Sequence, residues 1–157
     1  MTKRPRPPGL PAEELRVLHL ERGPAIRSRL AEFACVPRSE YFYELVYCLL
    51  TPQSSAQHAG MAVRLLRESG FDAREVDPEP LLRRPECYIR FHTTKALRLR
   101  DAKNGFAEIA AHLGNGADGA ELRVWLVENV RGIGWKESSH FLRNIGYRGL
   151  ATSTGTF

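Results

Sequence analysis

Apolar side chains recur at intervals of three and four residues along most of the chain, which is the spacing of one face of a helix. The clearest example runs through Phe42, Leu45, Val46, Leu49 and Leu50. Similar faces predict helices over about 39–51, 59–69, 94–113, 122–130 and 135–145. Alternation of apolar and polar residues, which is typical of strands, hardly occurs. The pattern therefore predicts an all-α fold with short connections.

Glycine and proline residues indicate where the helices are interrupted. Gly23 and Pro24 break an otherwise helical stretch over 12–36. We therefore expect two helices there, the second beginning at Pro24. Several prolines also lie within or beside 78–89, where we expect a short and interrupted helix.

The chain is basic, and its positive charge is unevenly distributed. It carries 23 Lys and Arg residues against 18 Asp and Glu residues, a formal charge of +5 at pH 7. The stretch 83–103 alone has seven basic and two acidic residues, a net +5. We expect the proline-rich residues 1–11 to form a flexible basic arm ahead of one helical domain over 12–151. This excess is compatible with a polyanionic partner, and equally with charge that serves solubility alone.

Three cysteines, Cys35, Cys48 and Cys87, lie far apart in the sequence. Their odd number and lack of paired spacing argue against a disulfide framework and against a zinc or iron–sulfur site. We therefore expect no metal and no other cofactor. No run of 18 apolar residues predicts a membrane span. We expect a monomer in the cytoplasm, associated with the nucleoid if its partner is DNA.

Two predicted helices are joined by Gly132-Ile133-Gly134, which makes a hairpin over 122–146. Glycines permit a positive φ and a close backbone approach, and Ile133 between them is expected to enter the core. The amides of the turn and of the next helix start then point outward together, an arrangement that binds phosphate. The segment predicts a contact with the DNA backbone that reads no sequence. A plain turn between helices is the simpler alternative.

Lys136 follows this turn and falls in the first turn of the next helix. A helix N-terminus disfavours positive charge and so favours the neutral amine, which is the form that attacks a carbon centre. We therefore expect Lys136 to be a nucleophile able to form a Schiff base with a sugar C1′. The alternative left by spacing alone is a further phosphate contact without covalent chemistry.

The hairpin sequence VRGIGWKESSHFLRNIGYRGLA, over 130–151, resembles the helix-hairpin-helix of the DNA glycosylase superfamily. More narrowly, it resembles the archaeal-type 8-oxoguanine DNA glycosylase/lyase, the second Ogg family. ELVYCLLTPQSSA over 44–56 and YIRFHTTKALRL over 88–99 are similar to two further segments of that family. The resemblance implies a base-excision enzyme that removes 8-oxoguanine from double-stranded DNA and cleaves abasic sites by β-elimination. It also implies that Lys136 is the Schiff-base nucleophile.

An enzyme that removes a base from a duplex has to extrude the nucleotide. We expect Gln53 to fill the gap or to touch the opposite base. The predicted DNA-binding residues are Gln53, Ser54, Arg90, His92, Lys95, Arg131, Gly132 and Gly134. Simpler interpretations stay open, because Ser54 also suits a helix N-cap and the basic residues over 90–98 also suit a solvated helix face.

Four more side chains have two interpretations each. Phe91, Trp125 and Trp135 are candidates for stacking on an extruded base, although aromatic residues at helical spacing more often pack in a core. His140 lies four residues after Lys136, on the same helix face, where it either orients the lysine or forms a structural hydrogen bond.

One feature of the family is missing. The resemblance implies an aspartate in a segment similar to Ala-Ile-Leu-Asp-Arg-His-Ile, and Thr154 stands at that position. Glu137 is expected to point away from Lys136, about 100° around the helix, so no substitute is evident. One nucleotide deletion in a suitable choice of codons converts that heptapeptide into the observed Ala-Thr-Ser-Thr-Gly-Thr-Phe. We therefore expect 152–157 to be an out-of-frame tail and the fold to be truncated at its C-terminus.

Two other functions compete with this hypothesis. Without the aspartate, the chain suits a non-catalytic DNA-binding helix-hairpin-helix module or pseudoenzyme. An endonuclease III-like enzyme for oxidised pyrimidines is disfavoured by the absence of a four-cysteine cluster. For the enzyme, we expect strongly reduced glycosylase activity.

Overall fold

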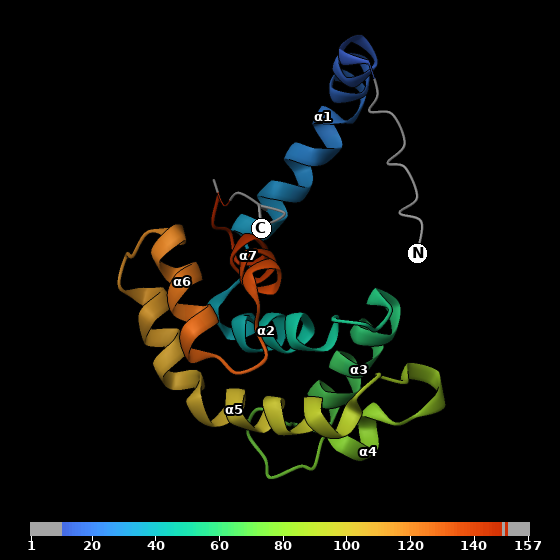
Figure 1. The fold of residues 1–157 in the computed structure, drawn as a ribbon, viewed down its shortest axis with the longest axis vertical. Helices are drawn as coiled ribbons and strands as arrows, with labels where there is room; N and C mark the ends of the chain where they lie inside the picture. Colours follow the sequence, from blue (N-terminus) through green and yellow to red (C-terminus); the bar gives the residue numbers. More distant parts are fainter. Residues whose placement is uncertain (1–10, 149, 151–157) are drawn as a thin grey trace, which may run out of the picture.

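The computed structural model describes residues 11–148 and Leu150, and this part of the chain contains helices and no strand (Figure 1). The α-helices are α1 (Ala12–Ala34), α2 (Tyr41–Leu50), α3 (Ala56–Glu68), α4 (Glu79–Leu82), α5 (His92–Gly114), α6 (Gly119–Asn129) and α7 (Trp135–Asn144). Two 3-10 turns, η1 (Arg38–Glu40) and η2 (Pro85–Cys87), precede α2 and α5. The all-α prediction is confirmed.

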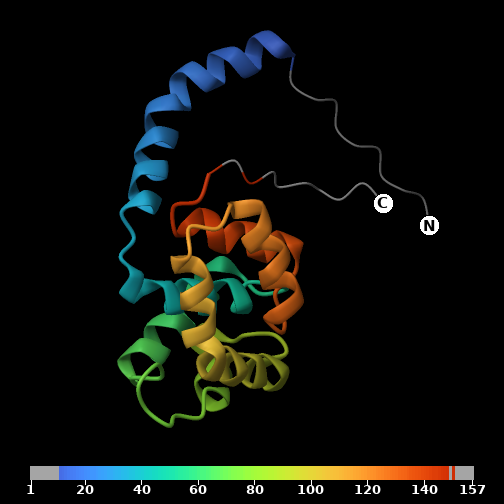
Figure 2. The same ribbon diagram turned by 90° about the vertical axis from the view of Figure 1, so that its left-hand side faces the viewer.

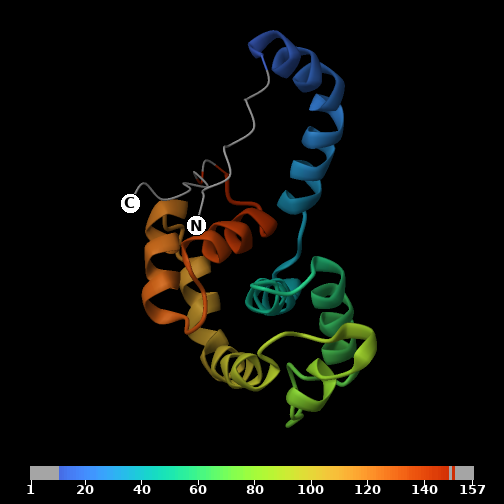
Figure 3. The same cartoon turned by 45° about the vertical axis from the view of Figure 1, so that its right-hand side comes forward.

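The centre of the fold is α2, which is apolar on almost every side and is therefore suited to burial. Its buried residues are Phe42, Tyr43, Leu45, Val46, Cys48, Leu49 and Leu50. Figure 3 looks nearly along α2 and shows the other helices arranged around it. Helices α3, α5 and α7 all contact α2. The helix that fixes the core thus also joins the α3–α5 side of the molecule to the α6–α7 hairpin.

The predicted break at Gly23-Pro24 is wrong, because α1 runs without interruption from Ala12 to Ala34 with Pro24 inside it. Proline removes one backbone hydrogen bond and crowds the preceding turn. Figure 2 shows that α1 curves along its length, which is the usual accommodation of a helical proline. The carbonyl freed at Leu20 lies on an exposed residue, so water can satisfy it.

Helix α1 projects away from the rest of the molecule and meets it at its C-terminal end, beside α7 (Figure 1). Most of its length is exposed, including several apolar side chains: Leu15, Val17, Leu18, Leu20 and Ile26. None of the described helices is both long and apolar enough to cross a membrane. The arm predicted over 1–11 lies outside the described residues apart from Pro11.

The other predicted boundaries lie within three residues of those in the structure. The interrupted helix expected over 78–89 is observed as α4 and η2. Helix α5 begins at His92, directly after Phe91, whose φ of 60° turns the chain sharply. Asp118 caps α6 by accepting a hydrogen bond from Ala120 N at 3.0 Å. These local signals determine the ends of α5 and α6 and so the direction in which the hairpin leaves the core.

Candidate active site

The hairpin between α6 and α7 has the geometry expected from its sequence. Ile133 is 6% exposed and packs in the core, and its N–H donates to Val130 O at 3.2 Å. Gly132 has a φ of +94°, which favours glycine. Gly134 instead has an extended φ of −105°, so its backbone conformation does not require glycine. A Cβ there would lie 2.9 Å from Glu137 Oε2, and the missing side chain leaves room for that carboxylate.

Arg98 of α5 packs directly against Gly132. A Cβ on Gly132 would lie 2.4 Å from Arg98 Cδ and 2.8 Å from Arg98 Nε. Arg98 Nε is buried and has no hydrogen-bond partner among the described residues. The absence of a side chain at Gly132 therefore has two effects. It permits the positive φ of the turn, and it leaves space for the aliphatic part of Arg98 from α5.

Two small residues after Lys136 bring α7 close to the core. Ser138 and Ser139 are fully buried, and their hydroxyls donate to Trp135 O at 3.1 and 2.9 Å. Arg123 of α6 donates from Nε to the same carbonyl at 3.2 Å. Three donors therefore hold the first turn of α7, in which Lys136 lies. Neither serine was predicted as a site residue, although small residues on the inner face of a helix are a signal of close packing.

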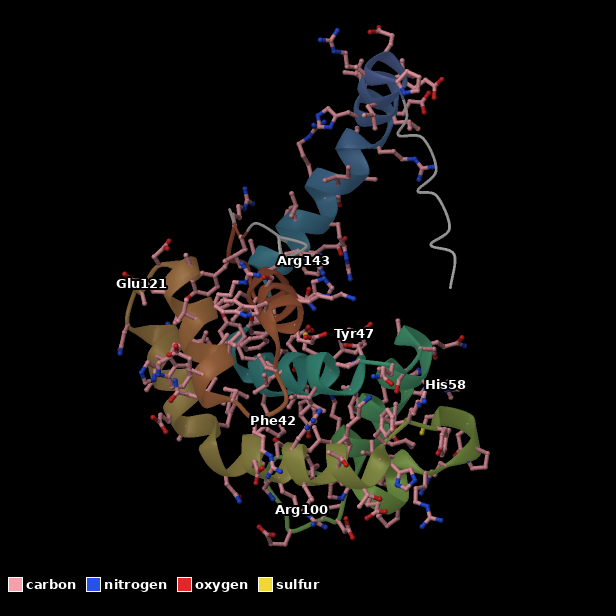
Figure 4. All side chains as sticks on the ribbon, in the orientation of Figure 1. Phe42, Tyr47, His58, Arg100, Glu121 and Arg143 are labelled. Atoms are coloured by element: carbon pink, nitrogen blue, oxygen red, sulfur yellow. The ribbon has the colours of Figure 1, made fainter. Side chains whose placement is uncertain are left out.

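A pocket of about 360 Å³ lies between the C-terminal half of α2, the turn that follows it and the face of α7 that carries Lys136. It is lined by Tyr47, Cys48, Thr51, Pro52, Gln53, Ala56, Lys136, Glu137, His140, Arg143 and Asn144. Figure 4 labels Tyr47 on α2 and Arg143 on α7, which lie on the two helices that border it. Of the lysines that the structure describes, Lys136 is the one that lines this pocket.

Glu137 lines the same pocket as Lys136, although the two residues are neighbours on the helix. Neighbouring residues on a helix are about 100° apart, and the pocket is wide enough to be bordered by both. The site therefore contains one carboxylate close in sequence to the lysine. Thr154, for which the resemblance implies an aspartate, lies outside the described residues, as does the predicted tail over 152–157.

Burial lowers the pKa of His140, and the positive charges of Arg143 and Lys136 lower it further, while Glu137 opposes them. His140 is therefore a neutral imidazole at pH 7. Burial raises the pKa of the Cys48 thiol to about 12, with a contribution from Glu44. This cysteine is thus a protonated, apolar wall of the pocket and not a nucleophile.

Gln53 lies in the turn between α2 and α3 with a φ of 56°, a left-handed conformation that is uncommon outside glycine. The alternative that Ser54 caps α3 is wrong, because the N-cap is Ser55, whose hydroxyl accepts from His58 N at 3.0 Å. The Ser54 hydroxyl instead accepts from Arg90 N at 3.2 Å. Gln53 and Lys136, predicted separately, are brought together in one pocket.

Lys95 does not lie on the surface, where we expected it to contact phosphate. It is 2% exposed and donates to Leu50 O, Pro52 O and Ser54 Oγ. Burial, and secondarily the charge of Arg98, lower its pKa to about 8. No signal along the chain predicts this burial, because the three acceptors of Lys95 lie more than forty residues earlier.

The other basic residues predicted to bind DNA lie in different surroundings. Arg90 is exposed, and its guanidinium lies 4.9 Å from the centre of the Phe91 ring. His92 is partly buried and lies 3.2 Å from Glu79 Oε1. On the hairpin, Arg131 is exposed and lies 3.4 Å from Asp101. Arg90 and Arg131 are therefore on the surface, where a phosphate can reach them, although Arg131, like the partly buried His92, already has a carboxylate partner.

The aromatic candidates also differ in their surroundings. Trp125 packs against the core and stacks on His112 with ring centres 3.8 Å apart, which supports the structural interpretation. Phe91 and Trp135 are each 52% exposed. In the described part of the chain, no three His, Cys, Asp or Glu side chains are placed to hold a metal ion.

Residues 26–152 match the protein family described as 8-oxoguanine DNA glycosylase. An 8-oxoguanine DNA glycosylase/AP lyase of Korarchaeum cryptofilum is 35% identical over 113 residues, which make up 71% of this chain and 53% of the relative. The crystal structure of the 8-oxoguanine DNA glycosylase of Thermotoga maritima matches with a TM-score of 0.71 and 28% identity, over 85% of this chain and 64% of that one.

A second solved structure is that of Methanocaldococcus jannaschii 8-oxoguanine glycosylase/lyase in complex with 15mer DNA containing 8-oxoguanine. It matches with a TM-score of 0.71 and 29% identity, over 86% of this chain and 66% of that one. The chain thus spans between half and two thirds of the length of these relatives. With the family match extending from α1 through the hairpin, the chain belongs to the 8-oxoguanine DNA glycosylase family of helix-hairpin-helix proteins.

Proposed function

We propose that this chain acts in base-excision repair on double-stranded DNA that contains 8-oxoguanine or abasic sites. The observation that carries the proposal is the position of Lys136, which lies in the first turn of α7, two residues after Gly-Ile-Gly, and lines the same pocket as Gln53. The names of the relatives and the neighbour solved with lesion-containing DNA support the same substrate class.

In the proposed reaction, the hairpin holds the backbone while the damaged nucleotide leaves the stack. The nitrogen lone pair of Lys136 attacks C1′ as the nitrogen gives up a proton, the bond from C1′ to the base breaks, and the base departs with that electron pair and takes up a proton. Ring opening then gives a Schiff base. Loss of a proton from C2′ breaks the C3′–O bond by β-elimination, and water finally releases the lysine.

Two other pocket side chains suit this reaction, one for proton transfer and one for charge stabilisation. The neutral imidazole of His140 can accept a proton, because its lowered pKa keeps a free ring nitrogen at pH 7. Glu137 supplies a negative charge near the developing positive charge on the sugar. The resemblance places Thr154 where the family has its aspartate, so we expect removal of 8-oxoguanine to be slower than cleavage of a preformed abasic site.

The test compares cleavage of an 8-oxoguanine duplex and of an abasic-site duplex by the wild-type chain and by Lys136→Gln. We expect loss of strand cleavage on both substrates in Lys136→Gln, with duplex binding retained. Lys103→Gln is the matched control, because this lysine donates to Arg74 O at 2.6 Å and does not line the pocket. Unchanged cleavage in Lys136→Gln contradicts the proposal.

The second candidate is a DNA-binding module without catalysis, which Thr154 at the aspartate position favours. It predicts duplex binding that weakens steeply with salt. It also predicts no strand cleavage by the wild-type chain on either substrate, so the same experiment distinguishes the two functions.

A further inference from the structure

A buried lysine contacts the turn between α2 and α3. Lys95 lies in the first turn of α5 and is 2% exposed. Its ammonium donates to Leu50 O at 2.7 Å, to Pro52 O at 2.6 Å and to Ser54 Oγ at 3.1 Å. An ammonium has three N–H groups, so each of them has an acceptor. The side chain therefore has no donor left for a phosphate.

The three acceptors surround Gln53 in the chain. Leu50 O belongs to the last residue of α2, where carbonyls lack helical partners. Pro52 O and Ser54 Oγ lie on either side of Gln53, whose φ of 56° is unfavourable for a residue with a side chain. Ser54 Oγ is held a second time, because it accepts from Arg90 N at 3.2 Å. Contacts from outside the turn thus hold a strained conformation in place.

This turn forms one wall of the pocket that contains Lys136. We propose that Lys95 is a positioning residue, which holds the left-handed turn at Gln53 so that Gln53 and Lys136 share one pocket. Its acceptors are the two carbonyls and the Ser54 hydroxyl, and it touches no DNA. The effect on catalysis rests on the function proposed above, whereas the effect on the turn does not.

The cost of this arrangement favours a specific role. Burying a charged amine without a carboxylate partner is unfavourable, and burial lowers the pKa of Lys95 to about 8. A methionine has a similar length and would fill the same space without this penalty. What methionine lacks is the ability to donate to three oxygen atoms at once. We therefore infer that the lysine is present to fix the conformation of the turn through its hydrogen bonds, and not to stabilise the core by packing.

The first test measures the turn without any DNA. Amide hydrogen exchange in Lys95→Met is compared with the wild-type chain at Ser54, whose N–H donates to Thr51 O at 3.0 Å. We expect exchange at Ser54 to become about tenfold faster or more, since local opening is no longer opposed. The amides of α7 should exchange at the wild-type rate. Unchanged exchange at Ser54 overturns the inference.

Two further variants keep this test decisive if Lys95→Met folds poorly. Ser54→Ala removes one acceptor of Lys95 and should accelerate exchange in the turn in the same direction, to a smaller extent. Lys103→Met removes the other lysine of α5 that the structure describes, which bonds Arg74 O away from the pocket, and should leave the turn unchanged. Equal effects of Ser54→Ala and Lys103→Met on the turn would also refute the inference.

The second test measures catalysis by single-turnover cleavage of an abasic-site duplex. For Lys95→Met, we expect the rate at saturating DNA to fall about tenfold or more. The turn that carries Gln53 would be displaced relative to Lys136, and such a displacement slows the chemical step. The Kd for the duplex should stay near the wild-type value, since the hairpin that binds the backbone is intact. A Gln53→Ala substitution should cost less in the Lys95→Met background than in the wild-type chain.

The outcomes separate the two claims. A wild-type chain that cleaves no substrate contradicts the proposed function, and the exchange experiment still decides the role of Lys95. A wild-type chain that cleaves DNA, together with a Lys95→Met variant that matches its rate and its exchange, overturns the role of Lys95 alone. A variant that loses duplex binding and cleavage in parallel also overturns it, because a surface contact with DNA would produce that pattern.

Discussion

Gly132 connects the hairpin to the rest of the fold through two separate constraints. Its φ of +94° disfavours a side chain, and the space that a Cβ would occupy is filled by the stem of Arg98. The first constraint belongs to the turn, and the second belongs to the packing of α5 against it. The backbone constraint was predictable from Gly-Ile-Gly. The packing constraint was not, because Arg98 lies 34 residues earlier in the chain.

Gly132→Ala should therefore destabilise the protein more than a substitution that meets the backbone constraint alone. Gly116 is the matched control, with a φ of +69° and no atom within 4 Å of an added Cβ. We expect a loss of about 1 kcal/mol in the free energy of unfolding for Gly116→Ala and about 2–4 kcal/mol for Gly132→Ala. Denaturant titration measures both, and equal losses would contradict the packing constraint.

His140 gives a pH-dependent prediction at the same scale. Its pKa is lowered in the fold by burial and by Arg143 and Lys136, so between the folded-state and unfolded-state pKa values the unfolded chain binds more protons. Stability then rises with pH in that window and is lost as the pH falls below about 6.5. His140→Gln should reduce the slope of unfolding free energy against pH in this range. An unchanged slope would show that other groups cause the acid sensitivity.

At the scale of helices and turns, features that depend on neighbouring residues could be predicted from the sequence. Contacts between distant segments could not. The Gly-Ile-Gly turn, the start of α7 and the helical face of α2 all follow from spacing along the chain. The burial of Lys95 does not, because a lysine is expected at the surface and its acceptors become visible only when α2 and α5 are packed. Gln53 was predicted as a site residue, but the reason for its conformation was not.

In helix α1, by contrast, a strong local signal, a proline, did not interrupt the helix. Pro24 predicted a new helix, yet the helix continues through it with a bend. We expect Pro24→Ala to restore one backbone hydrogen bond, straighten α1 and increase helicity measured by circular dichroism, with a gain of up to about 3 kcal/mol for the helix.

Pro37→Ala is the control for this prediction. Pro37 has a φ of −72° in an extended segment before η1, so its replacement frees the unfolded chain and adds no hydrogen bond within α1. We expect a small loss of stability there and no gain in helicity. If Pro24→Ala likewise leaves helicity unchanged, the bend in α1 has another cause.

For the whole molecule, the net charge of +5 is compatible with a polyanionic partner but does not locate a binding site. The structure divides the basic residues among the hairpin, the α5 start and the buried interior, so only some of them remain accessible. The family match then assigns the hairpin and its pocket to a known kind of fold, across 71–86% of the chain in the relatives and structures compared. The monomeric state stays a prediction.

The accessible charge of the hairpin predicts a salt-dependent effect. Arg131→Ala should weaken duplex binding and reduce the slope of log K against log salt by about one, as expected for the loss of one phosphate contact. Arg16→Ala is the matched control. The Arg16 side chain is exposed and paired with a carboxylate, as that of Arg131 is, but it lies on the projecting part of α1. An equal reduction for both variants would indicate that general charge, and not the hairpin, drives binding.

Lys136 is proposed as the amine that forms the covalent intermediate with DNA. Borohydride reduction of the wild-type chain on an abasic-site duplex, followed by digestion and mass spectrometry, identifies the residue that carries the adduct. The chain has four lysines, Lys3, Lys95, Lys103 and Lys136, so the result is unambiguous. We predict a single adduct on the peptide that contains Lys136. An adduct on any other lysine, or none at all under conditions in which the duplex is bound, would rule out Lys136 as the nucleophile.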